Sequence, residues 1–210
     1  MRDLESRLIN TCVKFGAFSK GNKIVDIGCG SGASTNELRK RQLDCFGVDQ
    51  RNDLIEQARG YYPQIQFQVG ESDRLEIESD SLDGVLLSGA FHHLRNPVQC
   101  AQEVFRVLKP GGVFVAFDPN RRNPFMRLYG NGKTAVSPVV AEEVSHVFEE
   151  VGFETSTKYV SGIHGDFADS AVARAVMPFC YYCDELLSRY LFSEKMAAFV
   201  ITKGTKRTTY

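Results

Sequence analysis

A glycine-rich segment, VDIGCGSG over residues 25–32, follows an apolar run and precedes a helical pattern. Glycines in this place let the backbone approach a ligand more closely than any Cβ atom would permit. Seventeen residues after Gly32, a second apolar run ends in Asp49, whose carboxylate can accept hydrogen bonds from both hydroxyls of a ribose. A tight turn and a solvated strand end would explain the same residues without a ligand, so this pattern alone does not establish a binding site.

The glycine spacing is ambiguous between two nucleoside ligands. Gly28, Gly30 and Ala33 formally satisfy the dinucleotide fingerprint of dehydrogenases, with Asp49 in the ribose-binding place. Asp26, however, stands two residues before the first glycine. A buried carboxylate there would repel a pyrophosphate, whereas it suits the ammonium group of S-adenosylmethionine (SAM). We therefore expect a SAM site and keep a dehydrogenase as the more distant alternative.

Two adjacent histidines and an aspartate have the chemistry needed for proton transfer. His92 and His93 follow an apolar run at 82–88, and Asp118 ends the next apolar run. Neutral imidazole is suited to remove a proton near pH 7, and a carboxylate can orient it as in a catalytic triad. One histidine is therefore a candidate base for methyl transfer, a reaction that requires no metal. In the alternative interpretation the histidines only cap a strand and Asp118 caps a turn.

The elements that position these residues are short β-rich runs that alternate with helical patterns. This alternation is typical of a mostly parallel sheet with helices on both faces, which binds ligands at the carboxyl ends of its strands. The predicted strands are 23–28, 45–49, 65–69, 82–88, 112–118, 153–160 and 197–202. The predicted helices are 33–41, 51–61, 97–108, 139–151 and 167–192, after an N-terminal helix in 1–20. Pro110, Gly111 and Gly112 are expected to stop the helix at 97–108 and turn the chain into the next strand.

Length and composition indicate one domain of ordinary size. The 210 residues are 43% hydrophobic, and 25 Lys and Arg balance 26 Asp and Glu, so there is no basic footprint for a nucleic-acid partner. The chain shows no signal-like segment and no apolar run long enough to span a membrane, and we expect a cytoplasmic protein. The six cysteines, including Cys180 and Cys183 of a CxxC, are expected to be reduced packing residues.

Several segments resemble the motifs of class I SAM-dependent methyltransferases in order and spacing. They are VDIGCGSG (motif I), VGES at 69–72, DSLDGV at 80–85, LSGAFHHL at 87–94 (motif IV) and VLKPGG at 107–112. Together they cover about residues 22–118 and look most like the type-11 group, which includes ubiquinone/menaquinone-biosynthesis and natural-product enzymes. Glu71 stands where Asp is usual, and Glu76-Ile77 replaces the common Pro-Phe.

The resemblance implies a doubly wound, Rossmann-like sheet of seven mostly parallel strands, with helices on both faces and an antiparallel last strand. It implies one domain, 1–210, with a SAM-binding half at 22–118 and an acceptor-pocket half with lid helices at 119–210. The implied SAM-binding residues are Asp26 at the amino group, Gly28, Gly30 and Gly32 at the methionine part, Asp49 at the ribose, Glu71 and Ser72 at adenine, with Gln50, Ser88 and Phe91 nearby. The implied catalytic residues are His92, His93 and Asp118, since some sugar O-methyltransferases of this type pair a motif IV histidine with an aspartate ending strand five.

Beyond Asp118 the resemblance becomes unspecific, which is expected of a region that shapes an acceptor pocket. The candidates there are Arg121, Arg122 and Arg127 as anion ligands or solvated side chains, and His164, Asp166, Phe179, Tyr181 and Tyr182 as lid or core residues. The helix at 167–192 could also contact a membrane surface.

We expect a SAM-dependent methyltransferase acting on a small-molecule acceptor, at a hydroxyl oxygen of a natural product, sugar or lipid-linked intermediate. The alternatives are C- or N-methylation, as of a quinone ring, and a SAM-binding partner protein without turnover.

Overall fold

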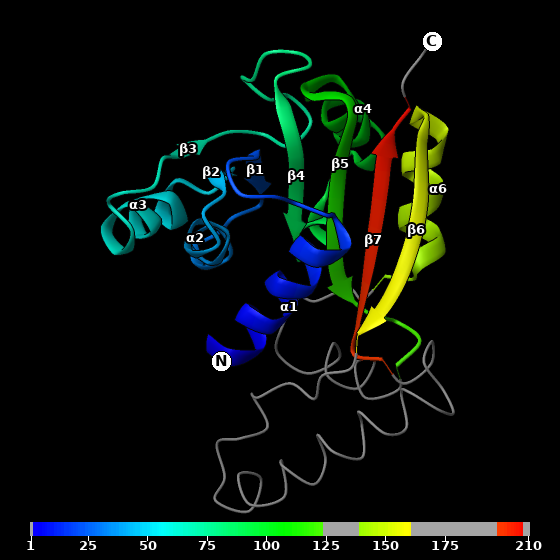
Figure 1. Cartoon of the computed structure of the whole chain (residues 1–210), viewed down its shortest axis with the longest axis horizontal. Coiled ribbons are helices and arrows are strands. Elements are labelled where there is room, and N and C mark those ends of the chain that lie inside the picture. Colours follow the sequence, from blue (N-terminus) through cyan, green and yellow to red (C-terminus); the bar gives the residue numbers. More distant parts are fainter. Residues whose placement is uncertain (1, 124–138, 161–196, 208–210) are drawn as a thin grey trace, which may run out of the picture.

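The structure is a computed structural model that describes residues 2–123, 139–160 and 197–207. Its strands form one seven-stranded sheet with helices packed on both faces (Figure 1). The strands are β1 (Lys23–Ile27), β2 (Asp44–Asp49), β3 (Phe67–Val69), β4 (Leu82–Ser88), β5 (Leu108–Pro119), β6 (Phe153–Val160) and β7 (Phe199–Lys206). The helices are α1 (Arg2–Phe15), α2 (Ala33–Lys40), α3 (Asn52–Tyr61), the short 3-10 helix η1 (Phe91–His93), α4 (Pro97–Val107) and α6 (Ala141–Val151).

The order of strands across the sheet is β3-β2-β1-β4-β5-β7-β6. Strands β1 to β5 pair in parallel, and β7 lies antiparallel between β5 and β6. The prediction of a doubly wound sheet with an antiparallel last strand is therefore confirmed. The strand order reverses between β1 and β4, and in such sheets the carboxyl ends of the two strands at the reversal flank a ligand-binding crevice.

The central strands contribute side chains to a separate core on each face of the sheet. Val25 and Ile27 of β1 pack in a cluster with α4 and α6. Ile24 packs on the other face, in a cluster with α1 and α2. Because side chains alternate along a strand, Asp26 shares the face of Ile24. Asp26 and its neighbour Ile27 therefore lie on opposite faces of the sheet.

Strand β5 begins earlier than the sequence predicted. Its register with β4 pairs Leu82 with Leu108 and then Gly84 with Val113, so residues 109–112 stand opposite Asp83 alone. The Pro-Gly-Gly segment is therefore a bulge within the strand and not a turn before it. Gly111 has a φ of +77°, a backbone conformation that favours glycine.

Several other element ends also differ from their predicted positions. Helix α1 ends at Phe15 instead of near residue 20, because the chain closes it with a turn in which Ala17 has a φ of +54°. Strand β3 begins at Phe67, since the backbone N–H of Ile65 donates to Tyr62 O in a turn. Strand β7 continues to Lys206, four residues beyond its predicted end at 202.

The side chain of Lys206 fastens β7 to the junction between α4 and β5. Its ammonium group donates to Phe105 O at 2.8 Å, to Leu108 O at 2.7 Å and to Asp80 Oδ1 at 2.6 Å. It also lies 4.6 Å from the centre of the Phe105 ring. Three acceptors and an aromatic face compensate for the burial of this charge, so the lysine ties residues about 100 positions apart into one structural unit.

Four of the six cysteines lie among the described residues, and Cys12, Cys29, Cys45 and Cys100 are all buried free thiols. The CxxC at 180–183, the predicted helix at 167–192 and the predicted lid residues from His164 to Tyr182 lie outside the described residues. Within the described part of the chain, no helix has the length and apolar character needed to cross a membrane.

Candidate active site

A cavity of about 420 Å³ opens at the carboxyl ends of β1, β2, β3 and β4. This volume falls within the range of roughly 300–1,000 Å³ that is typical of small-molecule sites. Of the predicted site residues, the cavity wall contains Gly28, Gly30, Asp49, Gln50, Glu71, Ser72 and His93. Segments far apart in sequence thus converge on the crevice that the strand order predicts.

Two glycines of the motif I loop form part of the cavity wall. Gly28 has a φ of +74°, and a Cβ there would lie 2.6 Å from the Cβ of Ala90. Gly30 has a φ of +53°, and the described residue nearest to a Cβ there would be Leu54, with its Cδ1 at 3.9 Å. Glycine at 28 is therefore needed for packing, whereas glycine at 30 leaves space open in the cavity.

The third glycine of the loop lies beneath the wall. Gly32 is buried with a φ of +86°, and a Cβ there would come within 2.7 Å of the Phe67 ring and 3.1 Å of Ala58 Cβ. Because Gly32 has no side chain, the start of α2 can pack closely against β3 and α3. The structure thus gives Gly32 a packing position and not the predicted ligand-facing one.

Asp49 is held in one orientation by the backbone. Its Oδ2 accepts from the Gly30 N–H at 2.9 Å, and its Oδ1 accepts from the Arg51 N–H at 2.9 Å. The residue is only 8% exposed, and its exposed part faces the cavity. Each carboxylate oxygen can accept more than one hydrogen bond, so this fixed group can still bind ligand hydroxyls.

Asp26 is not brought to the cavity. It is completely buried on the α1 and α2 side of β1, and its Oδ2 accepts from Ser34 Oγ at 2.6 Å and Thr35 Oγ1 at 2.7 Å. Burial raises the pKa of Asp26 to about 7, and the two hydroxyl hydrogen bonds oppose this increase. Direct contact with a ligand ammonium group, as the sequence predicted, is not available in this arrangement.

Ser88 and Phe91 also lie off the cavity wall. Ser88 ends β4 in the ladder opposite Phe117. The 3-10 turn of η1 directs Phe91 into the core, where it is 7% exposed and its ring centre lies 6.3 Å from that of Phe148. The expected role of Phe91 as a wall is therefore corrected to that of a core residue beneath α6.

The structure brings His92 and Asp118 together across the carboxyl ends of β4 and β5. His92 Nδ1 lies 2.7 Å from Asp118 Oδ1, and the His92 backbone N–H points to the same oxygen at 3.4 Å. The side chains are 5% and 1% exposed. With Nδ1–H donating to the carboxylate, Nε2 of His92 remains an acceptor, which is the form required of a base. The second carboxylate oxygen, Oδ2, is buried and has no hydrogen-bond partner within the described part of the chain.

His93 occupies a different position from His92. It is exposed on the cavity wall, and its ring centre lies 3.9 Å from that of His92. Partial burial and the neighbouring His92 lower the pKa of His93, while burial raises the pKa of Asp118 against the effect of its bonds to His92. The pair therefore divides into one histidine that faces the carboxylate and one that faces the cavity.

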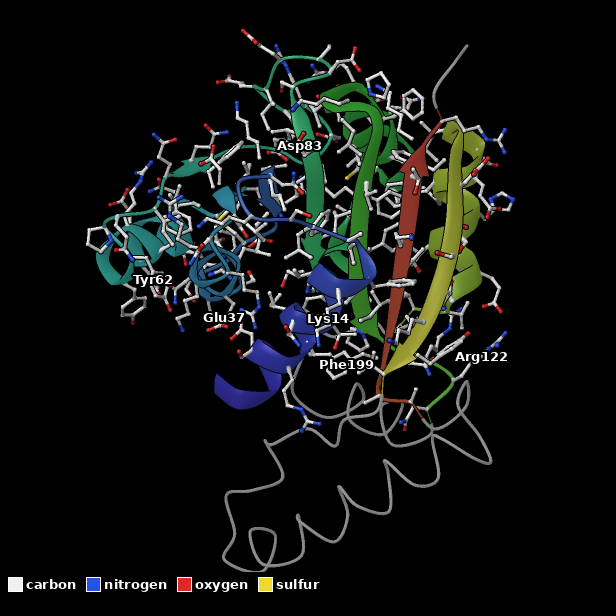
Figure 2. The ribbon with its side chains drawn as sticks, in the orientation of Figure 1. Lys14, Glu37, Tyr62, Asp83, Arg122 and Phe199 are labelled. Carbon is white, nitrogen blue, oxygen red and sulfur yellow. The ribbon has the colours of Figure 1, made fainter. Side chains whose placement is uncertain are left out.

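The arginines predicted as anion ligands are already paired where the structure describes them. Arg121 forms an ion pair with Glu143, and Arg122, which is labelled in Figure 2, donates to Glu142 Oε1 at 2.8 Å. Both glutamates lie in the first turn of α6. These contacts hold the segment after β5 against α6, and Arg127 lies outside the described residues.

Sequence reasoning did not single out some residues of the wall. Arg51, Leu54, Asp73, Gly89 and Arg95 all line the cavity. Only their positions in the sequence could have indicated a place at the site, since each follows a predicted strand or an identified motif by only a few residues. Their side-chain types alone carry no specific pattern.

Comparisons with known proteins agree with this architecture. Residues 25–116 match the family model described as a methyltransferase domain. An S-adenosylmethionine-dependent methyltransferase of Mycolicibacterium smegmatis is 29% identical over 140 residues, covering 64% of this chain and 52% of the relative. A demethylmenaquinone methyltransferase of Renibacterium salmoninarum is 26% identical over 127 residues, covering 60% of this chain and 54% of the relative.

A solved SAM-dependent methyltransferase from Archaeoglobus fulgidus has the same fold, with a TM-score of 0.73, 19% identity and coverage of 98% of this chain and 95% of that one. The chain spans about half the length of the curated relatives described above. The matched motifs, the strand order and the cavity beside the glycine loop lead to one assignment. Residues 25–116 form a class I SAM-dependent methyltransferase domain of the type-11 group.

Proposed function

We propose that the chain binds SAM in the cavity beside the motif I loop and transfers its methyl group to a small-molecule acceptor. Two features of the wall support the fit of SAM. Space is open where Gly30 and Gly89 lack side chains, and both have positive φ angles. Asp49 presents a fixed carboxylate with spare acceptor capacity, as ribose hydroxyls require.

The residues of the wall suggest how the ligand would be held. Gly28 and Gly30 would contact the methionine part, and Asp49 would bind the ribose. Glu71 and Ser72, with Gln50 beside them, would bind the adenine end, because they follow β3 and β2 on the far side of Asp49. Gly32, Ser88 and Phe91 would act only through packing.

The observation that carries the catalytic proposal is the hydrogen bond between His92 and Asp118. SAM supplies a methyl group activated by its sulfonium. The protein has to align the acceptor for in-line attack and remove a proton from it. His92 is oriented by Asp118 and lies next to His93, which is on the cavity wall. His92 would accept that proton from an acceptor hydroxyl. His93 would contact the bound ligands and hold the His92 ring in place.

A second reaction class has specific support. The demethylmenaquinone methyltransferase relative is named for action on a quinone precursor, which favours C-methylation as the alternative to O-methylation. A base at His92 would serve both, since a ring hydroxyl or a ring carbon must lose a proton. N-methylation and a SAM-binding protein without turnover are the remaining alternatives.

Calorimetric titration with SAM and with NAD tests the binding proposal. Micromolar binding of SAM is expected, and binding of NAD without SAM would contradict it. Mass spectrometry of an acceptor panel of sugars, phenols and quinone precursors would then detect the gain of one methyl group. His92→Ala serves as the matched control, because it should keep SAM binding and lose turnover. A protein that binds SAM but methylates nothing across hydroxyl, carbon and nitrogen acceptors would favour the non-catalytic alternative.

A further inference from the structure

Asp26 belongs to the motif I segment but has no access to the cavity. It is 0% exposed, its Oδ1 is buried with no hydrogen-bond partner among the described residues, and its neighbour Ile27 lines the cavity wall instead. Since successive side chains of a strand point to opposite faces, Asp26 faces α1 and α2. A role for this carboxylate has to pass through the residues that it contacts.

Those contacts are two hydroxyl groups in the first turn of α2. Ser34 Oγ and Thr35 Oγ1 both donate to the same carboxylate oxygen, at 2.6 and 2.7 Å. Both residues are buried, with exposures of 4% and 0%. Helix α2 has only eight residues, and its N-cap residue, Gly32, offers no side chain for capping. The carboxyl group on β1 therefore provides a hydrogen-bonded anchor for the start of this short helix.

The anchor spans the motif I loop, residues 28–32, which connects β1 to α2. Asp26 lies directly before the loop on β1, and its two partners lie directly after it on α2. On the cavity side, the same loop is fixed by the hydrogen bond from the Gly30 N–H to Asp49. A displacement of α2 would move Gly30 relative to Asp49, and would therefore change the shape of the wall where the ligand is proposed to bind.

We propose that Asp26 is a positioning residue that shapes the SAM site by holding the first turn of α2 through Ser34 and Thr35, without contacting SAM. This inference rests on the proposed function, because it presupposes that SAM binds in the cavity. In place of the ion pair between Asp26 and the ligand that the sequence predicted, Asp26 would act through its contacts with Ser34 and Thr35.

A mutant cycle distinguishes a positioning role of Asp26 from a direct ion pair between Asp26 and SAM. Equilibrium titration should show that Asp26→Asn and the double variant Ser34→Ala/Thr35→Val each weaken SAM binding by roughly 5- to 30-fold. The triple variant should lose little more than Asp26→Asn, because groups that act as one unit lose their joint effect once. Asp83→Asn is the matched control, since Asp83 bonds Lys23 and Lys109 away from the cavity wall and its loss should leave SAM affinity unchanged.

Conservative variants and a shortened ligand make the test independent of a general loss of stability. Thr35→Ser retains the hydroxyl and should keep parental affinity, whereas the isosteric Thr35→Val should reduce it. Binding of 5′-methylthioadenosine, which lacks the amino-acid part of SAM, should weaken in Asp26→Asn by a factor similar to that for SAM. Titrations at a temperature where melting curves show every variant fully folded remove the contribution of unfolding.

A direct ion pair predicts the opposite pattern. In that case Asp26→Asn would weaken SAM but not 5′-methylthioadenosine, and Ser34→Ala/Thr35→Val would leave SAM affinity unchanged or improved. Either result would overturn the inference. A parent protein that binds no SAM at all would instead refute the proposed function, so the two failures are distinguishable.

Discussion

His92 Nδ1 and Asp118 Oδ1, 26 positions apart in the chain, lie 2.7 Å apart at the carboxyl ends of two neighbouring parallel strands. Both side chains are buried, and the adjacent His93 reaches the cavity wall.

Replacing His92 with Ala should lower kcat by about 10²–10⁴ and leave SAM affinity nearly unchanged, because proton removal matters only on the way to the transition state. Asp118→Asn should cause a related loss, and the double variant should lose much less than the product of the two factors. His93→Ala is the comparison variant, expected to act mainly on ligand affinity. Steady-state rates and SAM titration check this; parental rates in both histidine variants would show that the pair is structural.

Replacing Asp49 with Ala should weaken SAM binding by roughly 1.5–3 kcal/mol, since it removes a charge-assisted ribose contact and the acceptor for the Gly30 N–H. Asp44→Ala is the matched control, because Asp44 is an exposed carboxylate paired with Arg39 at the start of β2, away from the cavity wall. Calorimetric titration measures both variants. Equal SAM affinity in Asp49→Ala and the parent would rule out the ribose assignment.

Alanine at Gly30 and at Gly32 should separate binding from stability. Gly30→Ala puts a methyl group into open cavity space, so we expect weaker SAM binding and a stability loss of only about 1–2 kcal/mol from the left-handed backbone. Gly32→Ala carries the same backbone cost plus a clash with the Phe67 ring, so its midpoint in urea unfolding should fall further. The reverse order of stabilities would contradict the assigned positions of the two glycines.

Removing the charge of Lys206 should destabilise the fold. Lys206→Met keeps most of the side-chain volume but leaves Phe105 O and Leu108 O without their buried donor, at a cost of about 2–3 kcal/mol. Lys158→Met, at an exposed position of β6, is the control and should change the free energy of unfolding by less than about 0.5 kcal/mol. Urea denaturation measures the difference, and equal stabilities of the two variants would refute the anchoring role.

The buried carboxylate of Asp26 should make stability depend on pH. Its pKa is raised by burial from 3.8 to about 7, with Glu5 and Asp49 adding to the increase and its bonds to Ser34 and Thr35 opposing it. The folded state therefore holds this proton more tightly than the unfolded chain. Its stabilising effect is complete below pH 4 and is lost as the pH rises to about 7, by about 4 kcal/mol at most.

Asp26→Asn removes this titration. Its stability relative to the parent should therefore rise between pH 5 and pH 8 in urea unfolding. Asp83→Asn is a control of opposite sign, because the bonds from Lys109 and Lys23 outweigh partial burial and lower the pKa of Asp83. A relative stability of Asp26→Asn that stays constant with pH would show that Asp26 does not titrate in this range.

The sequence determined the order and type of the described strands and α-helices, because apolar periodicity and glycine or proline stops are local signals. It also identified the residues that follow strands at the cavity, such as Gly30, Asp49 and Glu71, since parallel strands bring their carboxyl ends to one edge. The bulge at 109–112 could not be read from the sequence, because it depends on β5 already pairing with β4 at Leu108 and pairing again from Val113 onward.

Only the tertiary structure decided which side chains reach the cavity. Alternation along β1 indicates that Asp26 and Ile27 face opposite ways, but the face that meets the ligand depends on where α2 and α4 pack. The same holds for Phe91, which a 3-10 turn directs into the core. Which of the two histidines meets Asp118 was likewise decided by the alignment of β4 with β5, because contacts across a sheet depend on strand order and register and not on neighbouring sequence.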